Sequence, residues 1–127
     1  MPASYKIDFE RSRIRAEFYE EQTAASFRAL LEALIADPQV SPGMDMLTEH
    51  TRVTAFATAE MIFAMLPLLD QLAKRVGHLR IAMIAPRKVQ FGMANLLSTH
   101  VGLRQIDMEI RPFRDPVAAE AWLDAKR

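Results

Sequence analysis

The run LRIAMIAP, residues 79–86, most constrains the fold because it is almost continuously apolar. A strand of this composition is typical of parallel sheets that have helices packed on both faces. We therefore expect an α/β fold, with this strand at the centre of the sheet.

Four other short runs predict the rest of the sheet. YKIDF (5–9) and RIRAEFY (13–19) alternate with a period of two, which predicts a hairpin with a turn at residues 10–12. GMDML (43–47) is a third strand, and IDMEIRPF (106–113) is a half-exposed strand whose proline suits a sheet edge. The predicted apolar sides of the hairpin are Tyr5, Ile7 and Phe9, and Ile14, Ala16 and Phe18.

Four segments have the spacing of amphipathic helices. The second, residues 58–76, contains Pro67, which should kink it or start a new segment. In the last, Asp115 is the predicted cap and Pro116 the first helical residue, and Trp122 is expected to anchor the helix on the sheet. The predicted buried stripes are Phe27, Leu30, Leu31, Leu34 and Ile35; Met61, Met65, Leu68, Leu69, Leu72 and Val76; Val89, Met93, Leu96, Leu97 and Val101; and Val117, Ala121 and Trp122.

The order of elements is therefore ββαβαβαβα. Strands that alternate with helices predict a mostly parallel sheet, here of about five strands, with an antiparallel N-terminal edge and helices packed on it. No linker or low-complexity segment interrupts the pattern, so we expect residues 1–127 to form a single domain.

The composition disfavours several classes of function. Sixteen basic and sixteen acidic residues cancel, so no net charge attracts nucleic acid. The absence of cysteine excludes disulfides, thiolate metal sites and a cysteine nucleophile. No apolar run approaches the roughly 20 residues that span a bilayer, and the N-terminus has no signal core, so we expect a cytoplasmic protein without an integral membrane segment.

Two segments resemble the SpoIIAA-like group of bacterial proteins. IAMIAPRKVQFGMANLL (81–97) is similar to that group's central strand and following helix, and EIRPFRDPVAAEAWL (109–123) to its edge strand, charged turn and short helix. The group is similar in fold to STAS domains and, more distantly, to Sec14 or CRAL-TRIO lipid-binding domains. The resemblance implies a binding or regulatory module and no defined reaction.

In the STAS domains that act as anti-sigma-factor antagonists, a serine that follows an aspartate at the start of a helix is phosphorylated. The corresponding stretch here, TEHTRVTAFATAEM (48–61), has no Asp-Ser or Asp-Thr pair. A phosphorylation switch of that kind is therefore not predicted.

This stretch is expected to be a loop in which Thr58 caps the following helix. The alternative interpretation makes Thr51, Thr54 or Thr58 a phosphoacceptor, or part of a polar ligand site at the carboxyl ends of the strands. The candidate ligand or partner residues in it are Thr48, His50, Thr51, Arg52, Thr54 and Thr58.

Catalytic, metal and cofactor sites are not predicted. His50 lies beside Glu49, which permits a general base, but adjacent residues of an extended segment point to opposite faces. His78 and His100 have no ligand spacing.

Three other groups of side chains are candidates for binding. Arg87 and Lys88 open a helix and form a candidate anion site. Phe56 and Phe63 do not fit one buried stripe with Ile62, which makes them candidates for a partner or dimer surface. The eight methionines line either an apolar cavity or a plain core, and their stripe positions favour the core.

The leading hypothesis is a non-enzymatic binding or regulatory module that acts through a protein partner or as a homodimer. The alternative is a carrier of a small apolar or lipid-like ligand. An enzyme that uses His50 is the third hypothesis.

Overall fold

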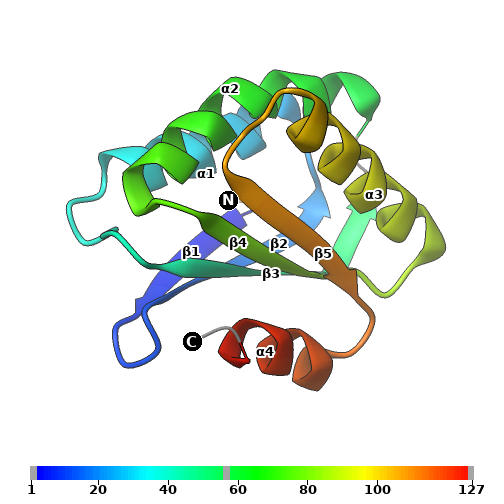
Figure 1. Cartoon of the computed structure of the whole chain (residues 1–127). Helices are drawn as coiled ribbons and strands as arrows, with labels where there is room; N and C mark the ends of the chain where they lie inside the picture. The colour runs from blue at the N-terminus through cyan, green and yellow to red at the C-terminus, as the bar shows by residue number, and fades with distance from the viewer. Residues whose placement is uncertain (1–2, 56–57, 126–127) are drawn as a thin grey trace.

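A computed structural model describes residues 3–55 and 58–125 of the chain, and it has the predicted order ββαβαβαβα (Figure 1). Its elements are β1 (Ala3–Asp8), β2 (Arg13–Glu21), α1 (Ala24–Ala36), β3 (Asp45–Ala55), α2 (Ala59–Val76), β4 (Leu79–Ile84), α3 (Lys88–Leu103), β5 (Met108–Phe113) and α4 (Pro116–Asp124).

The five strands form one sheet in the order β1-β2-β3-β4-β5. β1 is antiparallel to β2 and the other pairs are parallel, which confirms the predicted class of fold. The prediction that the LRIAMI strand is central was wrong, since β3 is central and β4 lies between β3 and the edge strand β5. The apolar composition of β4 reflects helices on both of its faces, and coverage does not fix a strand's position in the sheet.

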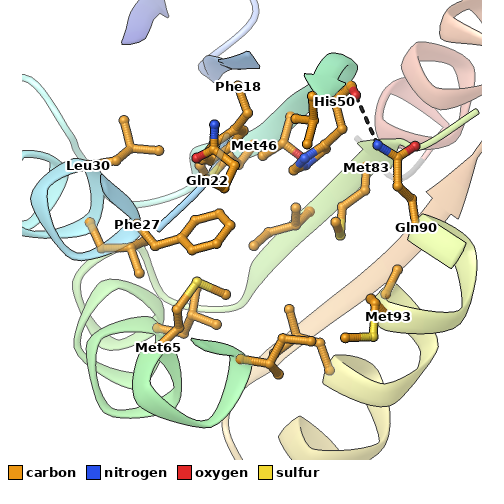
Figure 2. Close-up of a pocket in the computed structure, with 18 residues that line it drawn as sticks. Phe18, Gln22, Phe27, Leu30, Met46, His50, Met65, Met83, Gln90 and Met93 are labelled. Carbon is orange, nitrogen blue, oxygen red and sulfur yellow. Dashed lines mark hydrogen bonds between the residues drawn. The ribbon is translucent and has the colours of Figure 1, made fainter. Parts of the chain in front are cut away.

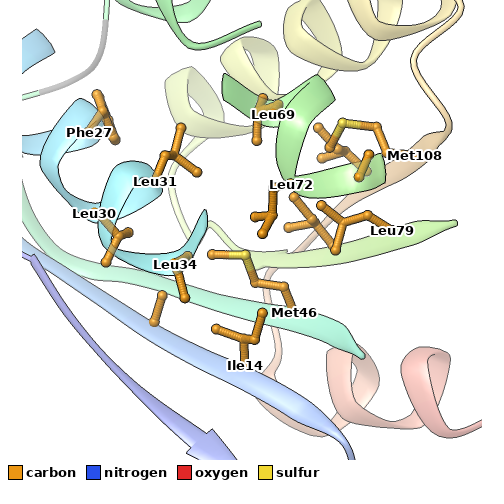
Figure 3. Packing of buried hydrophobic residues seen from close by; sticks show 14 of the residues in the cluster. Ile14, Phe27, Leu30, Leu31, Leu34, Met46, Leu69, Leu72, Leu79 and Met108 are labelled. Carbon is orange, nitrogen blue, oxygen red and sulfur yellow. The ribbon is translucent and has the colours of Figure 1, made fainter. Parts of the chain in front are cut away.

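Helices α1, α2 and α3 cover one face of the sheet, and α4 alone packs on the other face (Figure 1). The main core lies under the three helices and contains the fully buried side chains of Leu34, Leu66, Leu72 and Leu79. Figure 3 shows such residues between the helices and the sheet. A smaller cluster under α4 consists of Leu47, Ala82, Ile84, Ala119 and Leu123.

Capping residues set the ends of the second helix. The Thr58 hydroxyl accepts a hydrogen bond from the backbone N–H of Met61 at 3.2 Å, which confirms the predicted cap. Gly77 follows the last turn with φ of 87°, a conformation that glycine adopts without strain. Pro67 lies within one continuous helix, so the alternative that it starts a new segment was wrong.

Several predicted burials were also wrong. Phe9 is exposed because β1 ends at Asp8, whose carboxylate accepts a hydrogen bond from the N–H of Arg11 and starts the turn. Val89 and Val117 are exposed because they lie off the buried sides of α3 and α4, which pass through Gln90 and Ala119 instead. The buried side of α4 is Ala119 and Leu123; Ala121 is exposed and Trp122 half-buried.

The largest difference concerns residues 48–55, which were expected to be a loop and are the second half of β3. This segment pairs with the end of β2, where Glu17 lies opposite Glu49 and Glu20 opposite Val53. The polar residues of this segment led to the prediction of a loop, although threonine and valine both favour the extended backbone of a strand.

A candidate apolar ligand cavity

A cavity of about 100 Å³ lies between the sheet and the helices α1, α2 and α3. Four methionines line it, Met46 and Met83 from the strands and Met65 and Met93 from the helices (Figure 2). The other apolar lining residues are Phe18, Phe27, Leu30, Leu31, Val53, Ile62, Leu69, Ile81, Ala94 and Leu97, and the polar ones are Gln22, Thr48, His50 and Gln90.

Strand β3 contributes residues to the cavity on both sides of an irregularity. Between the pairs Glu17–Glu49 and Tyr19–Arg52 the chain of β3 has one residue more than that of β2, which is the arrangement of a β-bulge. Thr48 and His50 line the cavity by simple alternation, and the bulge brings Val53 to the same face, although strict alternation would send Val53 to the opposite one.

The imidazole of His50 is held in one orientation. Its ring stacks on Phe18 with a centroid separation of 4.7 Å and an interplanar angle of 6°, and its Nε2 lies 3.0 Å from the Thr48 hydroxyl oxygen. The His50 side chain is half-buried, because part of its ring faces the cavity and protein atoms cover the rest. Burial lowers the pKa of His50 from 6.5 to about 4 because it penalises the charged imidazolium, so the ring is neutral near pH 7.

Gln90 joins the start of α3 to β3 at the edge of the cavity. Its amide nitrogen donates to the backbone carbonyl of His50 at 3.0 Å (Figure 2), and its amide oxygen accepts from the N–H of Arg87 at 3.2 Å. The Arg87 guanidinium donates to the carbonyl of Val53 at 2.6 Å. Two hydrogen bonds therefore fix the end of β3 against the start of α3, and the bond between Arg87 and Gln90 orders that start.

The structure brings only two of the predicted site residues, Thr48 and His50, to the cavity. Thr51, Arg52 and Thr54 are exposed along the end of β3, and the Glu49 carboxylate accepts hydrogen bonds from the N–H and hydroxyl of Thr51, not from His50. The expectation of a loop there failed, so these threonines are strand residues.

The remaining candidates lie elsewhere. Thr58 is a helix cap. Phe63 is 39% exposed and contacts His100 edge-to-face at 4.6 Å between ring centroids. Phe56 lies outside the described residues. Arg87 and Lys88 are exposed at the start of α3, and Arg87 is already bonded to β3.

Sequence reasoning missed Gln22 and Gln90, whose buried side chains line the cavity. Gln90 had a usable signal, since a polar residue occupied a position one turn before the apolar Met93 and Ala94 on the inner side of a helix. For Gln22, which follows the last residue of β2, no pattern pointed inward.

A second polar cluster lies on the other face of the sheet and attaches α4. The guanidinium of Arg13 is fully buried and contacts Asp45 at 2.8 Å, Glu120 at 2.6 Å and Asp124 at 2.8 Å. Burial alone would lower the pKa of Arg13, but the hydrogen bonds that its guanidinium donates to these carboxylates outweigh this effect and raise the pKa. Arg15, at 2.9 Å from Glu120, lowers the pKa of that carboxyl.

Arg80 completes the attachment of α4. Its guanidinium lies 3.9 Å from the centre of the Trp122 ring and donates to the backbone carbonyls of Trp122 and Leu123. Arg13, Arg15 and Arg80 are thus engaged with α4, and we treat the cluster as structural.

No group of three or more His, Asp or Glu side chains suited to a metal ion occurs in residues 3–55 and 58–125. In the same residues, none of the helices combines the length and the apolar character needed to cross a bilayer.

A search of solved structures gives a clear relative in fold. The chain superposes on an uncharacterized DUF3478-family protein with a SpoIIAA-like fold from Shewanella loihica PV-4, with a TM-score of 0.61 over 95% of this chain and 93% of that one. The fold is SpoIIAA-like. At 18% identity this similarity establishes the SpoIIAA-like fold alone. No family model and no curated protein matches the sequence.

Proposed function

We propose that this protein is a non-enzymatic binding module that holds a small apolar molecule, or a small apolar group of a larger one, in the cavity beside His50. The observation that carries the proposal is the cavity itself, about 100 Å³ in volume and lined mostly by apolar side chains. Protein interiors contain few voids larger than a water molecule, so a void of this size is a feature to be explained.

The lining supports an apolar occupant. A dry cavity of about 150 Å³ lined by leucine, isoleucine and phenylalanine binds benzene, so a somewhat smaller one suits a group of about that size or less. The methionine side chains can adjust to an irregular shape because they are unbranched and flexible. None of the polar lining residues, Gln22, Thr48, His50 and Gln90, carries a charge near neutral pH.

The test is binding of benzene to the full chain, followed by thermal unfolding. A ligand at about ten times its Kd stabilises the native state by about 1.4 kcal/mol, which for a domain of this size raises the Tm by about 3–6 °C. Ala94 is buried on the cavity wall, so Ala94→Leu should fill the space and abolish the rise. Ala64→Leu, at an exposed position of α2, is the matched control and should respond like wild type.

If benzene leaves the Tm of wild type unchanged, or raises the Tm of Ala94→Leu equally, the cavity is not the binding site. Resonances of the cavity-lining methionine methyl groups provide a second readout. They should shift on addition of benzene in wild type and in Ala64→Leu, and should not shift in Ala94→Leu.

A protein partner or homodimer is the second candidate function, and one observation favours it. The exposed large apolar side chains include Phe63 on α2 and Val89 and Leu103 on α3. Native mass spectrometry of freshly purified protein separates the two functions, because a doubled mass supports the homodimer and a retained small-molecule adduct supports the cavity.

A further inference from the structure

We infer that His50 presents its Nδ1–H to the cavity as a hydrogen-bond donor, and that the ligand is therefore a compact apolar molecule with one neutral acceptor, such as a ketone, ester or amide carbonyl. This inference rests on the proposed function and specifies the chemistry of the same cavity.

The hydroxyl of Thr48 decides which ring nitrogen of His50 carries the proton. Thr48 is 5% exposed, and the sole hydrogen-bond partner of its hydroxyl within the described residues is His50 Nε2, at 3.0 Å. A hydroxyl proton in this environment needs an acceptor, since an unpaired buried donor is costly. If Nε2 accepts from Thr48, the neutral imidazole holds its proton on Nδ1.

Nδ1 of His50 is accessible. It has no hydrogen bond within the described residues, yet every fully buried side-chain nitrogen and oxygen described in this chain has a partner. Nδ1 must therefore face space that a small molecule can reach, and the cavity is the space that the ring lines.

The other polar groups on the wall are already engaged. Gln90 donates to the His50 carbonyl and accepts from the Arg87 N–H. Gln22 donates to the carbonyl of Tyr19 at 2.8 Å and accepts from the hydroxyl of Ser26 at 3.1 Å. Each of these amides uses its oxygen and an N–H within the protein, whereas Nδ1 of His50 makes no hydrogen bond within the described residues. The whole donor capacity of Nδ1 is therefore left for a ligand.

The ligand should be neutral. No side chain on the wall carries a charge near pH 7. An ionised carboxylate would lose its hydration in the cavity without gaining a cation, which is strongly unfavourable. A hydrocarbon would fill the space and leave the Nδ1–H unpaired, so a carbonyl should be preferred over a hydrocarbon of equal shape more strongly than in a cavity without the donor.

The first measurement is the tautomer of His50, from long-range ¹H–¹⁵N correlation spectra of labelled protein at pH 7. We expect Nδ1 to be protonated and Nε2 unprotonated. Thr48→Val keeps the shape of the side chain and removes the hydroxyl, so its His50 spectrum should show the loss of this fixed preference. A protonated Nε2 in wild type, or an identical tautomer in Thr48→Val, would overturn the inference whatever the ligand.

The second measurement compares cyclopentanone with methylenecyclopentane, which has the same ring and a carbon in place of the oxygen. Both are titrated into wild type and into His50→Phe, which retains an aromatic ring against Phe18 and has no N–H. The Kd ratio of hydrocarbon to ketone should be about fivefold larger in wild type, which corresponds to one neutral hydrogen bond of about 1 kcal/mol. His50→Phe also frees the Thr48 hydroxyl, which lines the cavity and can itself donate to the ketone. The titrations are therefore repeated in the double variant Thr48→Val/His50→Phe, in which neither donor remains.

The outcomes separate the inference from the proposed function. If neither molecule binds wild type, the proposed function fails and the inference with it. If both bind with the same ratio in wild type, His50→Phe and the double variant, the cavity binds ligands but His50 does not select them. Should His50→Phe fail to fold, Thr48→Val replaces it, and the same ratio should then fall toward the value expected without a fixed donor.

Discussion

We predict that removal of the buried guanidinium of Arg13 lowers the free energy of unfolding. The Arg13 side chain is 0% exposed, and the side chain of its partner Asp45 is only 6% exposed. Arg13→Met removes a charge that compensates Asp45. Glu120 still forms an ion pair with Arg15, and Asp124 still forms one with Arg11. The loss should therefore come mainly from the buried Asp45 carboxylate, which loses two hydrogen bonds from the Arg13 guanidinium.

The expected loss follows from this geometry. Breaking a buried ion pair by removing one partner costs about 3–5 kcal/mol, because a charge is left without compensation in the interior. Removing both partners can be nearly neutral when apolar side chains of similar volume replace them. The double variant Arg13→Met/Asp45→Leu should thus be more stable than Arg13→Met alone.

Urea unfolding followed by circular dichroism measures all of these free energies. Arg11→Met is the control, because the Arg11–Asp124 pair lies at the surface with side chains 52% and 45% exposed and should contribute about 0–1 kcal/mol. Equal stability of Arg13→Met and Arg11→Met would refute the reasoning. So would a double variant whose loss equals or exceeds the sum of the two single losses.

Three further predictions concern single residues. Because burial lowers the pKa of His50 to about 4, the unfolded chain binds the proton more readily, and stability should fall by up to about 3 kcal/mol as pH drops from 6.5 toward 4. Urea unfolding of His50→Phe should show a flatter profile in that window. Thr58→Ala should lose about 1 kcal/mol and Thr58→Asp close to none in thermal melts, with unchanged elution in size exclusion, because either hydroxyl or carboxylate can cap α2. Trp122→Ala should cost about 2–3 kcal/mol in urea unfolding, below the usual range for a fully buried aromatic, because the ring is half-buried under Arg80; a loss under 1 kcal/mol would show that Trp122 does not anchor α4.

The sequence predicted the order and class of the elements because each has a clear period. Alternation in 13–19 and the helical stripe of Phe27, Leu30, Leu31 and Leu34 come from residues that face a core wherever that core lies. Such patterns do not say which helix covers which face. The strand order of β3 and β4 was therefore misjudged.

The same limit explains why Arg13 was missed. In the alternating strand β2, Arg13 and Arg15 lie on the side opposite Ile14 and Ala16. The pattern alone predicts that this side is exposed to solvent. That face is covered at Arg13 by α4, whose Glu120 and Asp124 are four residues apart and therefore lie on one side of the helix. The acidic pair and the arginines are complementary, but 107 residues separate Arg13 from Glu120, and no local pattern connects them.

The site was only half predictable for a different reason. Thr48 and His50 were named for their polarity, and their position was expected in a loop. Once the segment is a strand, alternation brings both residues to the cavity, but the bulge that adds Val53 depends on pairing with β2 and exists only in the assembled sheet. A single inserted residue changes which side chains face inward, and sequence alternation alone cannot locate it.

The cavity wall combines groups that are fixed with groups that can move, and this division bears on what it can select. His50 is held by the stack on Phe18, by the Thr48 hydroxyl and, through its carbonyl, by Gln90. The methionines beside it have three rotatable bonds each and no hydrogen bond to hold them. Ligand shape can therefore vary as these side chains adjust, whereas the position of the Nδ1–H cannot. Selection in such a site depends more on where a ligand carries its acceptor than on the shape of its apolar part. A rigid hydrocarbon cavity, in contrast, selects its ligand by shape.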